Sequence, residues 1–207
     1  MKKLLFGLAI SAIALTSCSQ NKQTQDEKKN ETLETILNRR SIRAYTQESV
    51  SDEAVDIIIK AAINAPSARN AQPWQVRVVK NQGLINAIQD GVAERLKAQN
   101  PDFASRRVLF DAPVVIVVAN DTTNPYGQLD CGWLGQNILL AAHSLGLGTC
   151  VVAMANDFLW SDQAKGVVEK LNFPDNYKII YCVALGHQKD EIPDAKPRDM
   201  GKVQIID

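Results

Sequence analysis

The chain has 207 residues, of which 45% are hydrophobic and 22% charged, a balance typical of a soluble globular domain. The 23 Lys and Arg residues equal the 23 Asp and Glu residues in number, so the overall charge does not indicate a nucleic-acid-binding protein. Any charged ligand would have to be held by a local cluster of side chains.

The first residues carry the features of an export signal. Two lysines follow Met1, an apolar run extends from Leu4 to Leu15, and Thr-Ser then leads to Cys18. The apolar run is short for a membrane-spanning helix. Its end resembles a lipobox, in which the chain is cut before the cysteine and the thiol is lipidated. We expect residues 1–17 to be a bacterial lipoprotein signal peptide and Cys18 to anchor an extracytoplasmic protein to a bacterial membrane. The alternative is an ordinary signal peptide with a chance cysteine.

A polar segment follows the signal. Residues 19–31 contain no apolar side chain, so they cannot bury enough surface to fold. We expect residues 18–31 to comprise the lipidated cysteine and a flexible tether. The remainder, 32–207, is long enough for one domain with a sizeable core.

Apolar periodicity predicts the first elements of that domain. Helical spacing predicts a helix over Thr32–Asn38 and a second helix that Ser51 caps and that ends before Pro66. Alternation over Trp74–Lys80 predicts a strand, and Leu84–Lys97 again has helical spacing.

The middle of the chain is more apolar. The run Pro113–Ala119 is typical of a strand covered on both faces. Tyr126–Asp130 is predicted to be a turn region, followed by a long, nearly all-apolar helix over Leu134–Leu145 that Gly146 ends. We expect Thr149–Met154 to be extended.

The last elements are an amphipathic helix over Trp160–Leu171, a buried strand over Ile179–Leu185 and a polar tail from His187. About four strands are thus predicted, and they do not alternate regularly with helices. This pattern favours an α+β fold over a doubly wound sheet.

Cations and a hydroxyl gather directly after the first predicted helix. Arg39, Arg40, Ser41 and Arg43 fall within five residues. Arginine forks bind phosphate in bidentate fashion, so this segment is a candidate anion site. The alternative interpretation is a solvated basic face.

Two further segments are candidates. The loop Ala65–Trp74 combines small residues, side-chain amides and two prolines, and such loops allow a flat ligand to approach the backbone. Its alternative is a plain connector. Lys196 and Arg198 place two cations in the tail, for which a solubilising terminus is the alternative.

Residues for hydrolytic or metal chemistry are scarce. Cys131, Cys150 and Cys182 lie in apolar stretches without metal-binding spacing, so buried free thiols are expected. His143 lies on the apolar helix, where a core or interface role is more typical than that of a base, and His187 lies in the tail. No nucleophile-elbow, zincin or Walker sequence occurs. Scattered phosphate-type cations without such motifs suggest a cofactor that brings its own chemistry.

The sequence resembles the nitroreductase family at several places along the domain. Residues 39–45 (RRSIRAY) and 65–74 (APSARNAQPW) look like two signature stretches of that family, in the same order and spacing. Residues 145–150 are similar to its central segment. Residues 184–187 and 196–198 resemble its C-terminal end.

This resemblance implies a layered α+β fold with a mainly antiparallel sheet flanked by helices. It also implies a homodimer with two molecules of flavin mononucleotide (FMN) in the interface. By position, Arg39 and Ser41 would meet the ribityl phosphate, Lys196 and Arg198 would close over it, and Arg40 would contribute nearby.

The resemblance also places residues around the flavin ring. Arg43 would approach the N1–C2=O edge, where a cation stabilises negative charge on the reduced flavin. The backbone at Ala153 and Met154 would face N5, where hydride arrives and leaves. The ring would further contact Pro66, Ser67 and Ala68 of the other subunit, with Asn70 close by.

The sequence departs from the family at the pyrimidine edge. Family members often use Asn and Lys before the 113–119 strand, where alignment places Ser105 and Val108; Arg106 or Arg107 is a possible substitute. Pro197 replaces a more usual small polar residue. These departures concern the hydrogen bonding and potential of the flavin more than its presence.

The implied activity is ping-pong transfer of hydride to nitroaromatics, quinones or related conjugated acceptors. Family members usually take electrons from NADH or NADPH, which an exported protein would seldom meet. Three hypotheses follow: an unusual donor, an electron relay to a membrane partner, or a cytoplasmic enzyme with a misread signal. A competing class is a flavin-binding or ligand-binding lipoprotein without NAD(P)H turnover.

Overall fold

The computed structural model describes residues 30–100 and 107–206. The chain separates into two units, Met1–Asn30 and Glu31–Asp207, and only the second is described here. The predicted signal peptide and Cys18 lie outside the described residues. Within the described part, no helix is both long enough and apolar enough to cross a membrane.

The second unit is built on one sheet. Four strands in the order β1-β2-β4-β3 pair antiparallel throughout. The α+β prediction is therefore confirmed, and antiparallel pairing explains why the strands need no regular crossover helices. The strands are β1 (Trp74–Val79), β2 (Val114–Asp121), β3 (Gly148–Val152) and β4 (Tyr177–Gly186).

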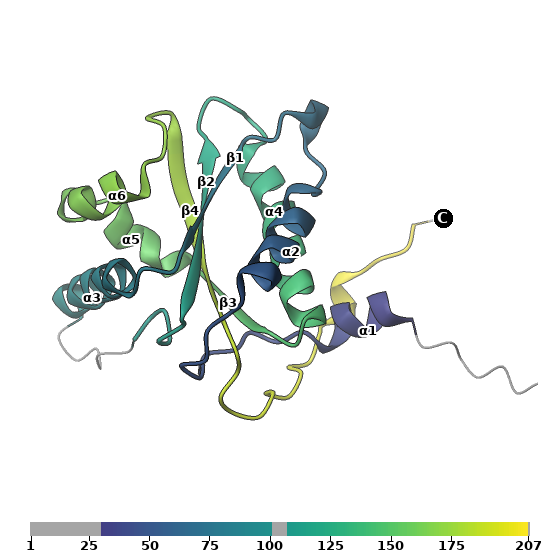
Figure 1. Ribbon diagram of the computed structural model, residues 1–207. Coiled ribbons are helices and arrows are strands. Elements are labelled where there is room, and N and C mark those ends of the chain that lie inside the picture. The colour runs from purple at the N-terminus through teal and green to yellow at the C-terminus, as the bar shows by residue number, and fades with distance from the viewer. Residues whose placement is uncertain (1–29, 101–106, 207) are drawn as a thin grey trace, which may run out of the picture. The chain divides into compact units, whose positions relative to one another are not determined.

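Helices cover both faces of the sheet (Figure 1). On one face α2 and α4 bury a cluster that includes Ile58 and Ile138, and on the other α3, α5 and α6 bury a cluster that includes Ile85. Burying one such isoleucine side chain completely stabilises the folded chain by about 1.5–3 kcal/mol relative to leaving it exposed to water. The helices are α1 (Glu31–Asn38), α2 (Asp52–Ile63), α3 (Gln82–Gln99), α4 (Gly127–Ser144), α5 (Asn156–Leu159) and α6 (Lys165–Leu171), with short 3-10 turns η1 (Ala68–Asn70), η2 (Ala153–Ala155), η3 (Asp162–Ala164) and η4 (Met200–Lys202).

The predicted turn at Tyr126–Asp130 is wrong, because α4 already begins at Gly127. A Cβ at this glycine would lie 2.9 Å from the Asp121 carbonyl oxygen, so the glycine permits close approach to β2 rather than a turn. The predicted end of the helix is confirmed. Gly146 has a φ of 73°, and the N–H of Leu147 donates to the Ala142 carbonyl at 2.9 Å.

Two other predicted elements are interrupted. β3 ends at Val152, and the chain then turns through η2, so the prediction that Thr149–Met154 is extended fails at its end. The predicted helix Trp160–Leu171 is also divided, since only its second part is α6. The Trp160 indole donates to the Ile179 carbonyl at 2.7 Å, and Ser161 is extended there. Anchoring the indole on β4 draws the backbone out of helical geometry.

The three cysteines of this unit are buried and free, as predicted. Burial raises the pKa of the Cys182 thiol to about 12, so this thiol is inert at neutral pH.

Candidate functional site

The arginine segment lies along the outer edge of the sheet. Ser41 forms a parallel bridge with Thr149 of β3, and the N–H of Ile42 donates to the Thr149 carbonyl at 2.9 Å. The buried Tyr45 hydroxyl donates to the Ile42 carbonyl at 2.7 Å. A Cβ at Gly148 would lie 2.9 Å from Ile42, so only glycine allows this close approach. The segment is therefore held firmly against β3.

Cationic side chains converge at the start of this segment. Arg39, Arg40 and His143 line one pocket of about 300 Å³, whose described lining contains no acidic residue. Burial and the neighbouring charges of Arg40 and Arg198 lower the pKa of Arg39. Burial, Arg39 and Arg40 likewise lower the pKa of His143. The lowered pKa keeps His143 neutral near pH 7, so Arg39 and Arg40 supply the positive charge, and the pocket favours an anion.

Some polar atoms at this site lack a protein partner. The Arg40 guanidinium donates to the carbonyls of Leu37 at 2.7 Å and Arg39 at 2.9 Å, which fixes it at the end of α1. Its Nε is nevertheless buried and unpaired, as is Oγ1 of Thr149. Buried polar groups usually have partners. These orphaned atoms therefore fit a site that a polar ligand completes.

Arg43 occupies an adjacent pocket of about 290 Å³ with a different charge balance. It shares this pocket with Ser41, Asp190 and Glu191, and its Nη1 donates to the Ser41 carbonyl at 3.2 Å. Two carboxylates therefore line the pocket of Arg43, whereas the described lining of the pocket of Arg39 and Arg40 has none.

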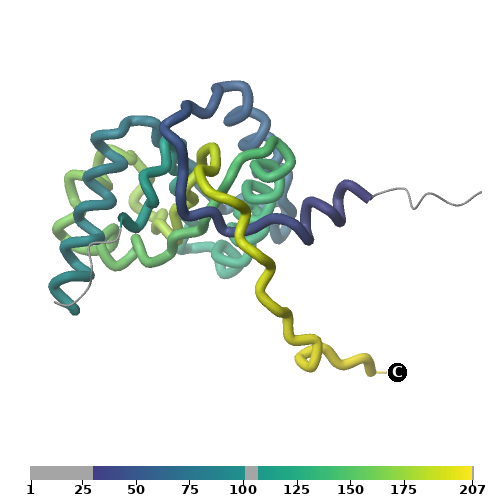
Figure 2. The backbone as a smooth tube through the Cα atoms, turned by 90° about the horizontal axis from the view of Figure 1, so that it is seen from below, coloured from purple at the N-terminus to yellow at the C-terminus, as the bar shows by residue number. Residues whose placement is uncertain are grey.

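The C-terminal tail supplies one of its two predicted cations to the cluster. The tail begins beside residues 44–46, because the N–H of Thr46 donates to the His187 carbonyl at 2.9 Å. It then leaves the body of the unit (Figure 2). Arg198 acts electrostatically on Arg39. Lys196 is exposed, and among the described contacts it meets Arg198 only through its carbonyl, at 3.0 Å.

The proline-containing loop lies at the other end of α4. The N–H of Ala68 donates to Asp130 in the first turn of α4, whereas His143 is in the last turn. Thirteen residues of helix separate them by roughly 20 Å. One chain therefore does not bring this loop to the arginine cluster. Pro66 and Asn70 are exposed, and Ser67 and Ala68 are half-buried.

The sequence analysis did not single out Asp130, and of the two roles expected for His143, in the core or at an interface, the core role is wrong. The predicted turn over Tyr126–Asp130 includes Asp130, although a lone carboxylate beside an apolar helical run is a visible signal. His143 is half-buried and faces arginines rather than the core.

The end of β3 presents the predicted N5 contacts. Ala153 and Met154 are exposed directly after the strand, and Val151 is an exposed apolar residue within it. A strand rises about 3.3 Å per residue, so the four residues from Thr149 to Ala153 span roughly 13 Å. Ser41 and Ile42 cover this edge at Thr149, and the exposed Val151 and Ala153 continue it away from the cation cluster, which suits an elongated ligand.

Of the residues expected at the pyrimidine edge, Arg107 and Val108 are among those that the structure describes. Ser105 and Arg106 lie outside the described residues, and Val108 is buried in the core. Arg107 forms an ion pair with Asp111. The proposed substitution by Arg107 therefore competes with an existing partner.

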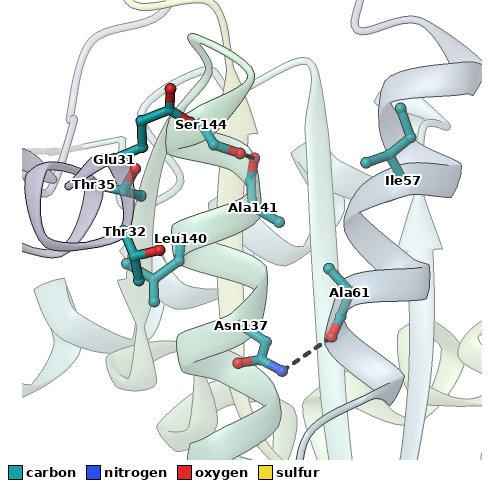
Figure 3. Close-up of a pocket in the computed structure, with 9 residues that line it drawn as sticks. All are labelled: Glu31, Thr32, Thr35, Ile57, Ala61, Asn137, Leu140, Ala141 and Ser144. Carbon is teal, nitrogen blue, oxygen red and sulfur yellow. Dashed lines mark hydrogen bonds between the residues drawn. The ribbon is translucent and has the colours of Figure 1, made fainter. Parts of the chain in front are cut away.

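A larger groove, of about 510 Å³, lies between α1, α2 and α4 (Figure 3). It is lined mainly by apolar and hydroxyl-bearing residues, and Glu31 is the charged residue of its described lining. This groove therefore lacks the cations of a phosphate site. Within residues 30–100 and 107–206, no group of three or more His, Cys, Asp or Glu side chains could hold a metal ion.

Comparisons with known proteins agree on one family. Residues 36–187 match the model of the nitroreductase family. The chain is 36% identical over 166 residues to an Archaeoglobus fulgidus protein provisionally named as an NADH dehydrogenase/NAD(P)H nitroreductase, covering 78% of this chain and 87% of that protein. It is 30% identical to a Vibrio harveyi NADPH-flavin oxidoreductase, covering 82% of this chain and 70% of that protein.

Solved structures give the same result. A Bacteroides fragilis nitroreductase with bound FMN has a TM-score of 0.79 and 25% identity, covering 86% of this chain and all of that one. A Desulfitobacterium hafniense nitroreductase with bound FMN has a TM-score of 0.75 and 34% identity, with 86% and 99% covered. The match spans the arginine segment, the proline-containing loop and β3, and the chain belongs to the nitroreductase family.

Proposed function

We propose that this chain is an FMN-dependent oxidoreductase of nitroreductase type. The observation that carries the proposal is the pair Arg39 and Arg40, with Arg198 nearby, in a pocket beside β3 whose described lining contains no acidic residue. Similar proteins contain bound FMN. When bound, FMN supplies two-electron transfer, accepting hydride from a donor and passing the electrons to an acceptor.

The residues divide into a phosphate end and a ring end. Arg39, Ser41 and Arg198 would bind the phosphate, with Lys196 closing over it and Arg40 contributing charge. These groups would hold and orient the cofactor. The basis for this assignment is the family resemblance together with the charge cluster.

The ring would lie along the open edge of β3. Arg43 would stabilise negative charge at the N1–C2=O edge. The exposed residues Ala153 and Met154 would leave N5 accessible, and exposed Val151 would offer an apolar surface to the ring.

We further propose a homodimer with two cofactor sites. The loop with Pro66, Ser67, Ala68 and Asn70 lies roughly 20 Å along α4 from the cation cluster, so it would serve the ring bound mainly by the other subunit. This arrangement makes each site depend on two chains.

Donor and acceptor would use the same face in turn, in a ping-pong order. Relatives are named NADPH-flavin oxidoreductase and nitrobenzene nitroreductase, which supports NAD(P)H as donor and nitroaromatics, quinones or similar conjugated acceptors. This chain's residues provide no general acid at Ala153 or Met154. Water would therefore protonate the reduced acceptor.

The lipobox-like sequence ending at Cys18 supports a second proposal, that the protein is a lipid-anchored lipoprotein outside the cytoplasm. An electron relay or flavin-binding module would then replace NAD(P)H turnover. Membrane fractionation of the full chain and of its Cys18→Ser variant tests the anchor. Equal partition of both into the soluble fraction would contradict it.

The visible spectrum tests the main proposal. The purified chain should be yellow, or become yellow on reconstitution with FMN, and a protein that cannot bind FMN would refute an oxidoreductase of this type. A stopped-flow screen of donors then separates the two functions. Bleaching by NADH or NADPH supports the enzyme, whereas bleaching by dithionite alone supports the relay.

A further inference from the structure

The proline-containing loop has an unusual backbone. Arg69, Asn70 and Gln72 have φ values of 57°, 54° and 47°, so three non-glycine residues lie in the left-handed region within four positions. Side chains make this region unfavourable. Such strain persists only where the surroundings hold it, and it concentrates at functional sites.

The strained segment is held from α4 by a buried carboxylate. The N–H of Ala68 donates to both oxygens of Asp130, at 3.3 and 3.2 Å, and Asp130 is only 3% exposed. Within the loop, the Ser67 hydroxyl accepts from the Gln72 N–H at 3.0 Å. The first turn of α4 is the positive end of the helix dipole, which favours the carboxylate there.

The buried charge shapes an exposed surface rather than the core. Trp74 anchors the far end of the loop in the hydrophobic core, but Pro66, Arg69 and Asn70 are exposed. Burying a carboxylate is costly, and an apolar side chain would suffice if packing alone were needed. The contact therefore fixes the conformation in which the loop faces outward.

We propose that Asp130 is a positioning residue for the flavin. It locks the loop around Ala68 in the shape that packs on the ring of the partner's cofactor. This inference rests on the proposed function, because the loop is assigned to the ring there. Asp130 itself touches the loop backbone and acts through it.

The test uses Asp130→Ala, Asp130→Asn and a control on the same helix. The control is Asn137→Ala, which removes another side-chain bond from α4, from Asn137 Nδ2 to the Ala61 carbonyl at 3.0 Å (Figure 3). Amide hydrogen exchange is measured in the FMN-free chain, and FMN affinity is measured by titration.

We expect Asp130→Ala to speed exchange at residues 68–72 and to weaken FMN binding, each on the order of tenfold. Asp130→Asn keeps one acceptor oxygen but loses the charge, so both properties should fall between those of Asp130→Ala and those of the wild-type chain. Asn137→Ala should leave both unchanged. If Asp130→Ala cannot be purified folded, reduced FMN affinity and faster exchange in Asp130→Asn than in Asn137→Ala support the inference, and equal values overturn it.

The two measurements separate this inference from the proposed function. Unchanged exchange in Asp130→Ala would overturn the role of Asp130 in the loop, whether or not FMN binds. Faster exchange with unchanged FMN affinity would overturn its role toward the flavin. A wild-type chain that does not bind FMN would instead refute the proposed function. The exchange data would still test whether Asp130 fixes the conformation of the loop.

Discussion

Arginine side chains that crowd one another without a nearby carboxylate weaken a fold unless an anion joins them. Arg39 is in this position, with Arg40 and Arg198 close enough to lower its pKa. We expect Arg39→Ala with Arg198→Ala to weaken FMN binding about 100-fold or more, because each charge-assisted bond contributes about 1.5–3 kcal/mol.

Fluorescence titration with FMN measures that loss. The control is Lys165→Ala with Lys170→Ala, which removes two exposed charges from α6. Full FMN retention in the arginine variant would show that the phosphate is bound elsewhere.

His143 gives the same cluster a pH signature. Its pKa is lowered in the folded chain by burial, Arg39 and Arg40, whereas the unfolded chain binds a proton near pH 6.5. The unfolded state therefore takes up the proton first as the pH falls, and the free energy of unfolding decreases from about pH 7 to pH 5.

We expect His143→Gln to reduce this acid sensitivity in the FMN-free chain. Urea unfolding of both proteins at pH 7 and pH 5 checks this prediction. Because His187 is present in both proteins, its contribution cancels in the comparison. Identical pH dependence of the two chains would contradict the prediction.

At the scale of elements, α4 depends on a glycine packed against β4. A Cβ at Gly135 would lie 2.5 Å from the Tyr181 hydroxyl oxygen, which itself donates to the Cys131 carbonyl at 2.5 Å. Gly135→Ala should therefore destabilise the chain by about 1–3 kcal/mol. Gly132→Ala, on the same helix, meets no atom within 4 Å and should stabilise by up to about 1 kcal/mol. Urea denaturation measures the free energy of unfolding of both variants. Equal values would show that contact with Tyr181 does not restrict the side chain at position 135.

At the scale of the whole molecule, the prediction concerns association of two chains through α1, a helix that has no buried residue. Leu33 and Leu37 are four positions apart and therefore share one helix face, with exposed fractions of 53% and 68%. We expect Leu33→Glu with Leu37→Glu to shift the protein from dimer to monomer and to lower its FMN content, because charges there oppose apolar association.

Sedimentation velocity and the flavin-to-protein absorbance ratio measure this shift. Gln163→Glu with Gly166→Glu, at exposed positions near or within α6, adds the same charge and should leave the dimer intact. A wild-type chain that sediments as a monomer would rule out the shared site.

Much of the fold was predictable from local signals. Ser51 accepts from the Ala54 N–H at 3.1 Å and caps α2 as expected, and Gly146 ends α4. The errors arose where a distant contact decided the backbone. Gly127 faces β2 and Trp160 is tied to β4, so neither position could be assigned from its neighbours in sequence.

The sequence by itself determined the α+β class, the buried strands, the family resemblance and the arginine segment that is predicted to bind phosphate, because periodicity and residue chemistry are local properties. Only the tertiary structure decided which of those groups meet. It brings Arg198 and His143 to Arg39, places the proline-containing loop at the opposite end of α4, and reveals Asp130 beneath it. Contacts between residues far apart in the chain depend on packing around the sheet, which no local pattern records.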